Sequence, residues 1–317
     1  GYMPTLPRER LAGAYLYYDA TTDDARLTLT VARTAALDHG AVVLNRAEVV
    51  GFLHDGDQLG GVRIRVDDGS GQHREVSVRA AHVVAAAGVW SDRVRGLDRA
   101  HAPDTIRPAK GVHITVPWEK VRNEIAAVVP VPKDRRSVFV VPWGDQTYIG
   151  TTDTDYDGPL DDPRCTDEDV DYLLRAINGS VDQPITRDDI TGTWAGLRPL
   201  VKTAGSGRTA DLSRRHRVTV DDDGLVTING GKLTTYREMA EDTVDAVVAR
   251  LDDATRGRVH RRARTKKLAL RGAVGYEQVL GLGARGAGRA AVTDADVAHL
   301  ADRYGGEART LLAMVEA

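Results

Sequence analysis

Apolar residues recur with a helical period near the start of the sequence. Leu27, Val31 and Ala35 follow one another at intervals of four, so we expect them to share and bury one face of a helix over residues 22–39. Thr22 is the expected N-cap, because a threonine hydroxyl accepts a hydrogen bond from the free amides of a helix start. The next residue after this segment is a glycine, which is typical of a helix end.

Strands are predicted after this helix. Residues 41–44 form a short apolar run, and residues 82–88 form a longer run of small apolar residues that favours a strand buried on both faces. Between these runs, apolar and polar residues alternate over residues 62–66 and 76–80, on either side of a turn rich in aspartate and glycine. This alternation predicts an antiparallel hairpin with one face in solvent.

The middle of the chain favours antiparallel strands. Residues 112–117, 138–143 and 148–152 are short β-rich segments punctuated by proline and tryptophan. One helix interrupts them, and it begins at Thr166 with Asp169 three residues later, which is the spacing of a capping box.

A second hairpin and a long helix follow. Residues 217–220 and 225–228 predict the hairpin, and a pair of glycines then precedes an amphipathic helix over residues 235–251. Beyond residue 253 a basic run leads into an alanine-rich helical remainder, so we predict a domain boundary there. The pattern as a whole predicts a mixed α/β (α+β) fold.

Composition narrows the classes of protein. The 317 residues suffice for about two domains. With 43 basic and 46 acidic side chains, the net charge of −3 argues against a strongly basic nucleic-acid-binding domain. The lone Cys165 excludes an internal disulfide and a multi-thiolate metal site, and it fits a reducing, cytoplasmic compartment. No apolar run approaches the roughly 18 residues of a membrane-spanning helix.

Two strings imitate ligand sites and are rejected. Residues 281–286 match a dinucleotide-binding glycine loop, but no buried strand leads into them, so we predict a glycine-rich loop between helices. Residues 153–158 open like a calcium loop, but Arg164 stands where the twelfth loop position needs an acid. The scattered histidines lack metal-ligand spacing, so we predict no metal site.

Four other strings combine small residues with charged or reactive side chains. Small residues at a strand end allow a cofactor to approach the backbone, although a tightly packed strand–helix junction has the same composition. A histidine and a lysine at the start of a strand also fit an ordinary half-buried strand. The four strings are residues 83–92, 107–114, 192–200 and 229–237.

Two cations in these strings point to anions. Arg198 lies among apolar and small residues, so its guanidinium needs either an internal carboxylate or a ligand phosphate. Lys232 follows two glycines at a helix start, where free amides and the helix dipole favour an anion or an electron-rich ring edge. A plain helix cap is the structural alternative, but a cap has no use for this lysine.

The four strings, in this order and together with residues 149–153, resemble the flavin-dependent glycerol-3-phosphate dehydrogenases of bacteria and mitochondria. The resemblance begins at about Tyr15 and extends into the tail over residues 292–313. The related glycerol-3-phosphate oxidases share most of these motifs.

The resemblance implies FAD as cofactor and sn-glycerol 3-phosphate as substrate, with a hydride passing from C2 to the flavin N5 and dihydroxyacetone phosphate as product. It implies that His113 takes the 2-hydroxyl proton, that Arg198 and Arg214 bind the substrate phosphate, and that Lys232 lies by both flavin and substrate. The residues matching segments that line FAD are Ala47, Val49, Ala86, Ala87, Gly88, Gly230, Gly231, Lys232, Leu233, Thr234 and Thr235.

The same resemblance divides the chain into four parts. It implies an incomplete Rossmann-like FAD-binding domain over residues 1–95 and 225–252, an antiparallel substrate domain over residues 96–224, and the start of a helical domain over residues 253–317. The family's first strand and its Gly-x-Gly-x-x-Gly loop have no match here, nor do its last helices. We therefore expect a piece of a longer dehydrogenase with weak FAD retention.

Partners follow from the resemblance as well. It implies a quinone acceptor reached from the cytoplasmic face of the membrane, and it leaves a homodimer open. The basic run over residues 256–267 is either a solvated linker or a contact with anionic lipid. An oxygen-using oxidase and a phosphate-ligand binding module without redox chemistry are the alternative functions.

Overall fold

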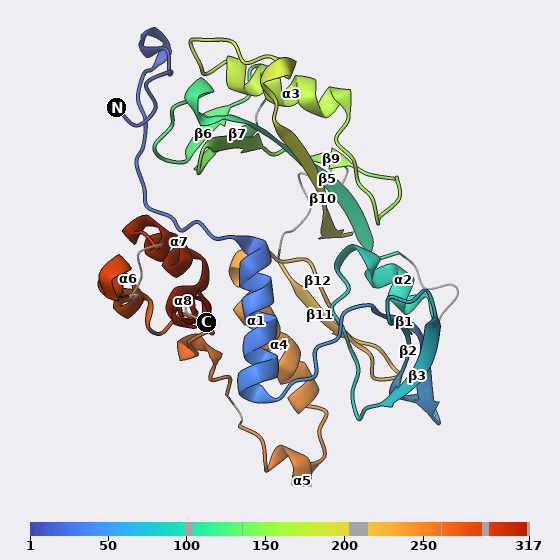
Figure 1. Cartoon of the computed structure of the whole chain (residues 1–317). Helices are drawn as coiled ribbons and strands as arrows, with labels where there is room; N and C mark the ends of the chain where they lie inside the picture. The colour runs from blue at the N-terminus through green and yellow to red at the C-terminus, as the bar shows by residue number, and fades with distance from the viewer. Residues whose placement is uncertain (99–103, 135, 203–214, 261, 287–291, 316–317) are drawn as a thin grey trace. The chain divides into compact units, whose positions relative to one another are not determined.

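A computed structural model describes residues 1–98, 104–134, 136–202, 215–260, 262–286 and 292–315. The chain divides into two compact units (Figure 1). Unit 1 comprises Gly1–Tyr17 and Glu48–Arg256, and unit 2 comprises Tyr18–Ala47 and Gly257–Ala317. Each unit therefore combines segments that are distant in sequence.

The largest sheet of unit 1 is antiparallel and has the strand order β10-β5-β8-β7-β6, with β9 pairing with β5. This arrangement confirms the predicted antiparallel strands. The strands are β5 (Ile106–Pro117), β6 (Ala127–Pro130), β7 (Ser137–Trp143), β8 (Gln146–Gly150), β9 (Thr154–Asp155) and β10 (Gly192–Val201).

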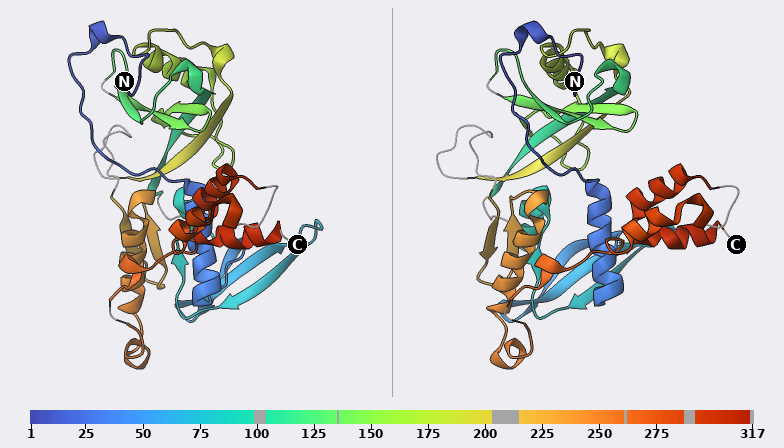
Figure 2. Two further views of the ribbon diagram at one scale, coloured as in Figure 1. Left: turned by 60° about the vertical axis from the view of Figure 1, so that its left-hand side comes forward. Right: turned by 90° about the vertical axis from the view of Figure 1, so that its left-hand side faces the viewer.

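One helix covers one face of this sheet. Helix α3 (Asp167–Asn178) lies against β5, β6, β7 and β8 in both views of Figure 2. Its Leu173 and Ile177 are fully buried, as are Val112 and Ile114 of the sheet. Full burial of each such side chain stabilises the fold by about 1.5–3 kcal/mol relative to exposure. The apolar core therefore occupies the α3 side, and the other sheet face is available for a site.

The predicted capping box at the start of α3 is confirmed. The Thr166 hydroxyl accepts a hydrogen bond from the Asp169 amide at 3.4 Å, and the Asp169 carboxylate accepts one from the Thr166 amide at 3.0 Å. The same carboxylate is buried and receives the Lys110 ammonium at 2.5 Å. Lys110 therefore joins β5 to the helix, on the core side of the sheet.

Both predicted hairpins are confirmed. In the first, Val62 pairs with Val78 and Ile64 with Val76. The second hairpin is extended by a parallel strand, giving the order β11-β12-β4. These sheets contain β1 (Ala47–Asp55), β2 (Gln58–Asp67), β3 (His73–Arg79), β4 (Val84–Ala85), β11 (Arg217–Val220) and β12 (Val226–Asn229).

Two strand predictions are wrong in extent. Residues 41–44 form no strand, and Val42 is 85% exposed, because no described strand runs beside them to complete a hydrogen-bonded ladder. The run over residues 82–88 contributes only the two residues of β4, and Val84 is 44% exposed. Ala85 is buried whereas Val84 is not, so within the described chain only one face of β4 is covered and the predicted burial on both faces is absent.

Short helices complete unit 1, including the predicted amphipathic helix as α4. The α-helices are α2 (Ser91–Arg95), α4 (Tyr236–Val248) and α5 (Asp253–Arg256). Among its described residues, the unit also has the single-turn 3₁₀ helices η1 (Arg8–Arg10), η2 (Gly88–Trp90), η3 (Trp118–Lys120), η4 (Arg187–Asp189) and η6 (Leu233–Thr235).

Unit 2 is helical. It contains α1 (Asp24–His39), α6 (Tyr276–Gly286), α7 (Asp294–Tyr304) and α8 (Ala308–Met314), with η7 (Thr265–Lys267) and η8 (Gly305–Glu307). Its core consists of Val279, Val297, Ala301, Ala308 and Leu312.

Two predictions about unit 2 need correction. Helix α1 is capped by Asp23, whose carboxylate accepts from the Arg26 amide at 3.0 Å, because the helix begins two residues after Thr22. Its predicted apolar face is only half-buried. Residues 281–286 lie within α6, and the predicted loop between helices is reduced to a kink at Gly283, whose backbone is non-helical. No described strand leads into them, so the dinucleotide loop stays rejected.

Candidate functional site

Aromatic side chains gather on the sheet face opposite α3. Side chains alternate along a strand, so His113 points away from the core that its neighbours Val112 and Ile114 enter. Trp194 is its register partner on β10 and stacks on the imidazole, with ring centroids 4.8 Å apart and planes 15° apart. Tyr148 of β8 meets the imidazole edge-on at 5.7 Å. The histidine is therefore fixed by two aromatic neighbours.

A glycine makes room for this histidine. Gly150 is the register partner of His113 on β8. A Cβ atom at position 150 would lie 2.2 Å from the His113 Cδ2 atom, which no side chain tolerates. The ring therefore lies over the backbone of β8 only because position 150 has no side chain.

Arg198 lies on the same face, one strand away from the histidine. Its guanidinium donates to the Asp153 carboxylate at 3.2 Å, to the Thr151 hydroxyl at 3.2 Å and to the Thr152 carbonyl at 3.3 Å. Its side chain is 28% exposed. Of the two partners that the sequence allowed, an internal carboxylate is therefore present, and it comes from the string that resembled a calcium loop.

A second glycine, Gly111, leaves space for this guanidinium over the sheet. A Cβ atom at Gly111 would lie 2.6 Å from Arg198 Nη2, and also 2.6 Å from the Thr151 hydroxyl. Gly111 lies two residues before His113 on β5, so both glycines clear space on one sheet face. The two glycines therefore leave room for the His113 imidazole and the Arg198 guanidinium on the same sheet face.

The ends of two parallel strands bring other predicted segments together. β4 and β12 run parallel, with Val84 opposite Val226, so the chain leaves both strands at the same edge. Ala86, Ala87 and Gly88 follow β4 at that edge, and residues 230–235 follow β12. Cofactors bind at such strand ends in α/β proteins.

The two strand-end turns are linked and rich in glycine. The fully buried Ser91 hydroxyl lies 2.8 Å from the Gly88 carbonyl oxygen and 2.6 Å from Asn229 Oδ1. Gly88, Gly230 and Gly231 have φ angles of 57°, 74° and 77°, values that favour glycine. A Cβ atom at Gly88 would meet nothing within 4 Å, so this edge is open to a ligand.

One carboxylate connects this edge to the large sheet. Asp92 of α2 accepts hydrogen bonds from the amides of Thr105 and Ile106, both at 2.9 Å, and from the Thr105 hydroxyl at 2.7 Å. The turn η2 also lies against β5 and β10. The strand-end turns and the face that carries His113 therefore belong to one packed body.

Of the remaining predicted site residues, none that the structure describes lies on the sheet face that carries His113 and Arg198. Lys232 is exposed and extended just before η6, which contains Leu233, Thr234 and Thr235. Val49 lines a cavity of 560 Å³ in unit 1 together with Trp90, the last residue of η2. Ala47 belongs to unit 2, because the division between units falls directly after it. Arg214 lies outside the described residues.

Sequence reasoning missed part of this site. Trp194 and Asp153 lie in the strings that carry the resemblance, and Tyr148 begins a predicted strand, but local sequence gives none of the three a role. Because side chains alternate between the two faces of a strand, residues separated by an even number lie on the same face, so Trp194 and Arg198, four residues apart, are predicted to share one face. Lys110 and His113 are three residues apart, so the same alternation predicts that they point to opposite faces. Within the described chain, no group of three or more His, Cys, Asp or Glu side chains is placed to hold a metal ion.

Comparison with known families gives one match over most of the chain. The profile of the family described as FAD dependent oxidoreductase matches residues 2–246.

Individual proteins are similar over long segments. The chain is 41% identical over 311 residues to "Glycerol-3-phosphate dehydrogenase" of Mycobacterium leprae, which covers 98% of this chain and 51% of that protein. It is 39% identical over 254 residues to "Glycerol-3-phosphate dehydrogenase, mitochondrial" of Homo sapiens, covering 78% of this chain and 34% of that protein. The chain therefore spans about half the length of the bacterial relative.

A solved structure has the same fold. The glycerol-3-phosphate dehydrogenase from Bacillus halodurans, complexed with FAD, superposes with a TM-score of 0.84 at 35% sequence identity. The superposition covers 98% of this chain and 59% of that chain.

Proposed function

Because this chain belongs to the family of FAD-dependent oxidoreductases, we propose that it carries the substrate-facing and part of the flavin-facing structure of an enzyme that oxidises sn-glycerol 3-phosphate to dihydroxyacetone phosphate. The names of its bacterial and mitochondrial relatives support this substrate. The observation that carries the proposal is that the His113 imidazole and the Arg198 guanidinium lie on the same sheet face. This face is packed beside the open ends of β4 and β12.

The strand-end edge fits FAD. Two adjacent turns with left-handed glycines allow close approach of a ring system to the backbone, and a side chain at Gly88 would fill the open space there. The segments that would line the cofactor are residues 86–88 and 230–235, with Ala47 and Val49 proposed for the adenine end. When bound, FAD supplies the hydride acceptor, its N5 atom, for the hydrogen on substrate C2.

Arg198 would bind the phosphate of the substrate. A guanidinium pairs with phosphate through two parallel hydrogen bonds, and the bonds to Asp153 and Thr151 hold its plane in place before the ligand arrives. Arg214 is proposed as a second phosphate ligand.

His113 would take the proton of the 2-hydroxyl group. Imidazole is a suitable base near neutral pH, and stacking on Trp194 holds the plane of its ring. Lys232 would balance the negative charge that develops at the flavin edge.

Two substitutions test these roles in the protein expressed from its complete natural reading frame. His113→Ala is expected to lower kcat by about a hundredfold or more, because it removes proton transfer from the transition state. Arg198→Ala is expected to raise KM for glycerol 3-phosphate with a smaller change in kcat. Initial rates of dye reduction measure both. Unchanged kcat and KM in both variants contradict the proposal.

The same assay separates the alternative functions. Stoichiometric hydrogen peroxide without added acceptor would identify an oxygen-using oxidase, whereas we propose quinone as acceptor. Stabilisation by glycerol 3-phosphate without any reduction of the dye would indicate a phosphate-binding module instead.

We also propose a peripheral position on the cytoplasmic face of the membrane. Among the described residues, no helix is long and apolar enough to cross a bilayer. The exposed Lys266 and Lys267 of η7 carry charges that attract anionic lipid. Sedimentation with anionic liposomes should weaken when both become glutamine, and unchanged sedimentation would leave this segment as a solvated linker. Sedimentation velocity distinguishes a monomer from the homodimer that the family resemblance leaves open.

A further inference from the structure

Unit 2 contains a cavity of its own, with a volume of 540 Å³. This volume lies in the range of small-molecule sites. Its wall is formed by α1, the segment before α6, the end of α7, η8 and α8. Every residue that lines it belongs to unit 2, so it is distinct from the sheet face and the strand ends of unit 1.

The wall carries four guanidinium groups against one carboxylate. The cations are those of Arg26, Arg33, Arg271 and Arg303, and the carboxylate is that of Glu307. Asp23 and Asp38 approach two of these arginines from outside the wall. The cavity therefore keeps an excess of positive charge even when these neighbours are included.

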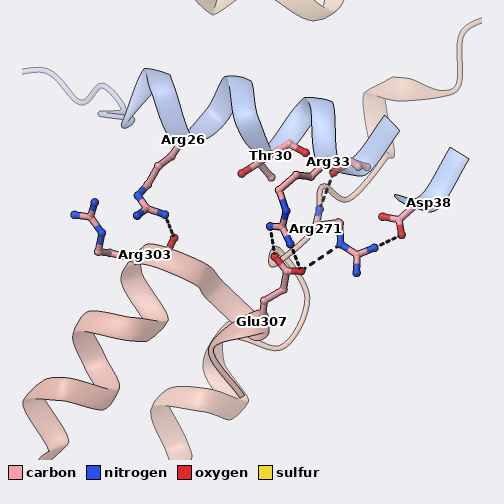
Figure 3. Close-up of polar contacts among 8 residues, drawn as sticks. Arg26, Thr30, Arg33, Asp38, Arg271, Arg303 and Glu307 are labelled. Carbon is pink, nitrogen blue, oxygen red and sulfur yellow. Dashed lines mark hydrogen bonds and ion pairs between the residues drawn. The ribbon is translucent and has the colours of Figure 1, made fainter. Parts of the chain in front are cut away.

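Two of the arginines form a fixed frame (Figure 3). Arg33 pairs with both oxygens of Glu307, at 2.8 and 3.0 Å. Arg271 binds the same carboxylate at 3.2 Å and also forms an ion pair with Asp38 of α1. The two guanidinium groups hold the pKa of Glu307 below its usual range. This network joins α1 to η8 and fixes the shape of the cavity.

The other two arginines retain unused donors. Arg26 forms one hydrogen bond to the Arg303 carbonyl oxygen at 3.3 Å and a 3.5 Å ion pair with Asp23, and it stacks over the Tyr304 ring at 4.8 Å. Stacking uses the face of the guanidinium and leaves N–H groups at its edge. The Arg303 side chain has no hydrogen-bond or ion-pair partner among the described residues. Two guanidinium groups thus offer donors at one end of the cavity.

The remainder of the wall is hydroxylic and apolar. Thr30 of α1 lies between Arg26 and Arg33 in Figure 3, and its hydroxyl donates to no described residue. Leu29 and Met314 also line the cavity, and they are 58% and 66% exposed. Apolar side chains at that exposure gain from being covered by a ligand.

We propose that this cavity binds a phosphate monoester attached to an apolar group, with the phosphate on Arg26, Arg303 and Thr30 and the apolar part against Leu29 and Met314. Guanidinium groups bind phosphate bidentately, and the fixed Arg33–Glu307–Arg271 network means that little order is lost on binding. The ligand chemistry is shared by soluble alkyl phosphates and by lipids with a terminal phosphate.

The test uses n-hexyl phosphate as the probe and isothermal titration calorimetry of the full chain. Arg303→Gln removes the cation without a described partner, so it should leave the fold intact while weakening binding about tenfold or more. Arg309→Gln is the matched control, because Arg309 is an exposed arginine of α8 that does not line the cavity. Arg198→Gln controls for binding at the phosphate site proposed in unit 1.

The expected result is a binding event that Arg303→Gln weakens and that both Arg309→Gln and Arg198→Gln preserve. Equal binding by the chain and its Arg303→Gln variant overturns the proposal, as does equal weakening by Arg309→Gln. If inorganic phosphate binds as tightly as n-hexyl phosphate, the proposed contact of an apolar group with Leu29 and Met314 is overturned. Binding to vesicles containing phosphatidic acid that depends on Arg303, without binding of the soluble probe, assigns the site to a lipid. Loss of all binding only in Arg198→Gln refutes this cavity and supports the site in unit 1.

Discussion

Adding one methyl group at Gly111 should displace the guanidinium that we assign to the substrate phosphate. The new Cβ atom would lie 2.6 Å from Arg198 Nη2 and 2.8 Å from Nη1. Ordinary contact begins at 3.4 Å, so the guanidinium must retreat by about 0.8 Å. Its bonds to Thr151 and to Thr152, at 3.2 and 3.3 Å, cannot survive that shift.

The cost falls on ligand binding more than on folding. The atoms that must move are the end of the flexible Arg198 side chain and the Thr151 hydroxyl, which a rotation about one side-chain bond can displace. Gly111 does not have the left-handed backbone that alanine avoids. A misplaced charged hydrogen bond costs about 1.5–3 kcal/mol, so KM for glycerol 3-phosphate should rise roughly tenfold to a hundredfold. The melting temperature should change little.

Steady-state rates with glycerol 3-phosphate and a dye acceptor measure the effect, and thermal melting monitors the fold. Gly60→Ala is the matched control, because a Cβ atom at this position of β2 meets its nearest neighbour at an ordinary 3.5 Å. If Gly111→Ala keeps the wild-type KM while Arg198→Ala raises it, the placement of the guanidinium over Gly111 has no functional role. A parallel loss of melting temperature would instead assign the effect to stability.

Three further predictions concern other contacts. Lys110→Met leaves the buried Asp169 carboxylate without its cation, so the melting temperature should fall by roughly 10 °C, and adding Asp169→Asn should restore most of it; no fall would contradict a buried ion pair. The hydrogen bonds from Arg136 lower the pKa of Asp134 to about 2, so its stabilisation is present above about pH 4 and lost as the pH falls toward 2. Urea unfolding should therefore distinguish Asp134→Asn from the wild type at pH 7 but not at pH 2. Ser91→Ala removes the link between the strand-end turns and should weaken flavin binding about tenfold, as measured by quenching of flavin fluorescence; unchanged affinity would show that the link is dispensable.

Local signals in the sequence were sufficient for several elements. The capping box at Thr166 and the alternation over residues 62–80 each depend on residues close in sequence, so composition and spacing predict them directly. The sheet that carries His113 was also predicted as antiparallel. The same string contains Lys110, and only the alternation of strand faces shows that this lysine packs into the core.

The rest depends on partners that a local pattern does not contain. A run such as residues 41–44 is apolar enough for a strand, but a strand also needs a neighbour, and none lies beside it in the described chain. The Asp153 partner of Arg198 lies 45 residues away in sequence, and the cavity of unit 2 joins α1 to residues more than 230 positions later. Such juxtapositions are set by tertiary packing, so residue types predicted the chemistry of the site but not its geometry.

The carboxylate of Asp92 has a mechanical consequence. It accepts hydrogen bonds from the amides of Thr105 and Ile106 and from the Thr105 hydroxyl, where the chain enters β5. Its own helix, α2, begins directly after the Gly88 turn. Asp92 therefore sets where β5 begins relative to the Gly88 turn, so the strand that carries His113 and the strand-end turn share one anchoring side chain.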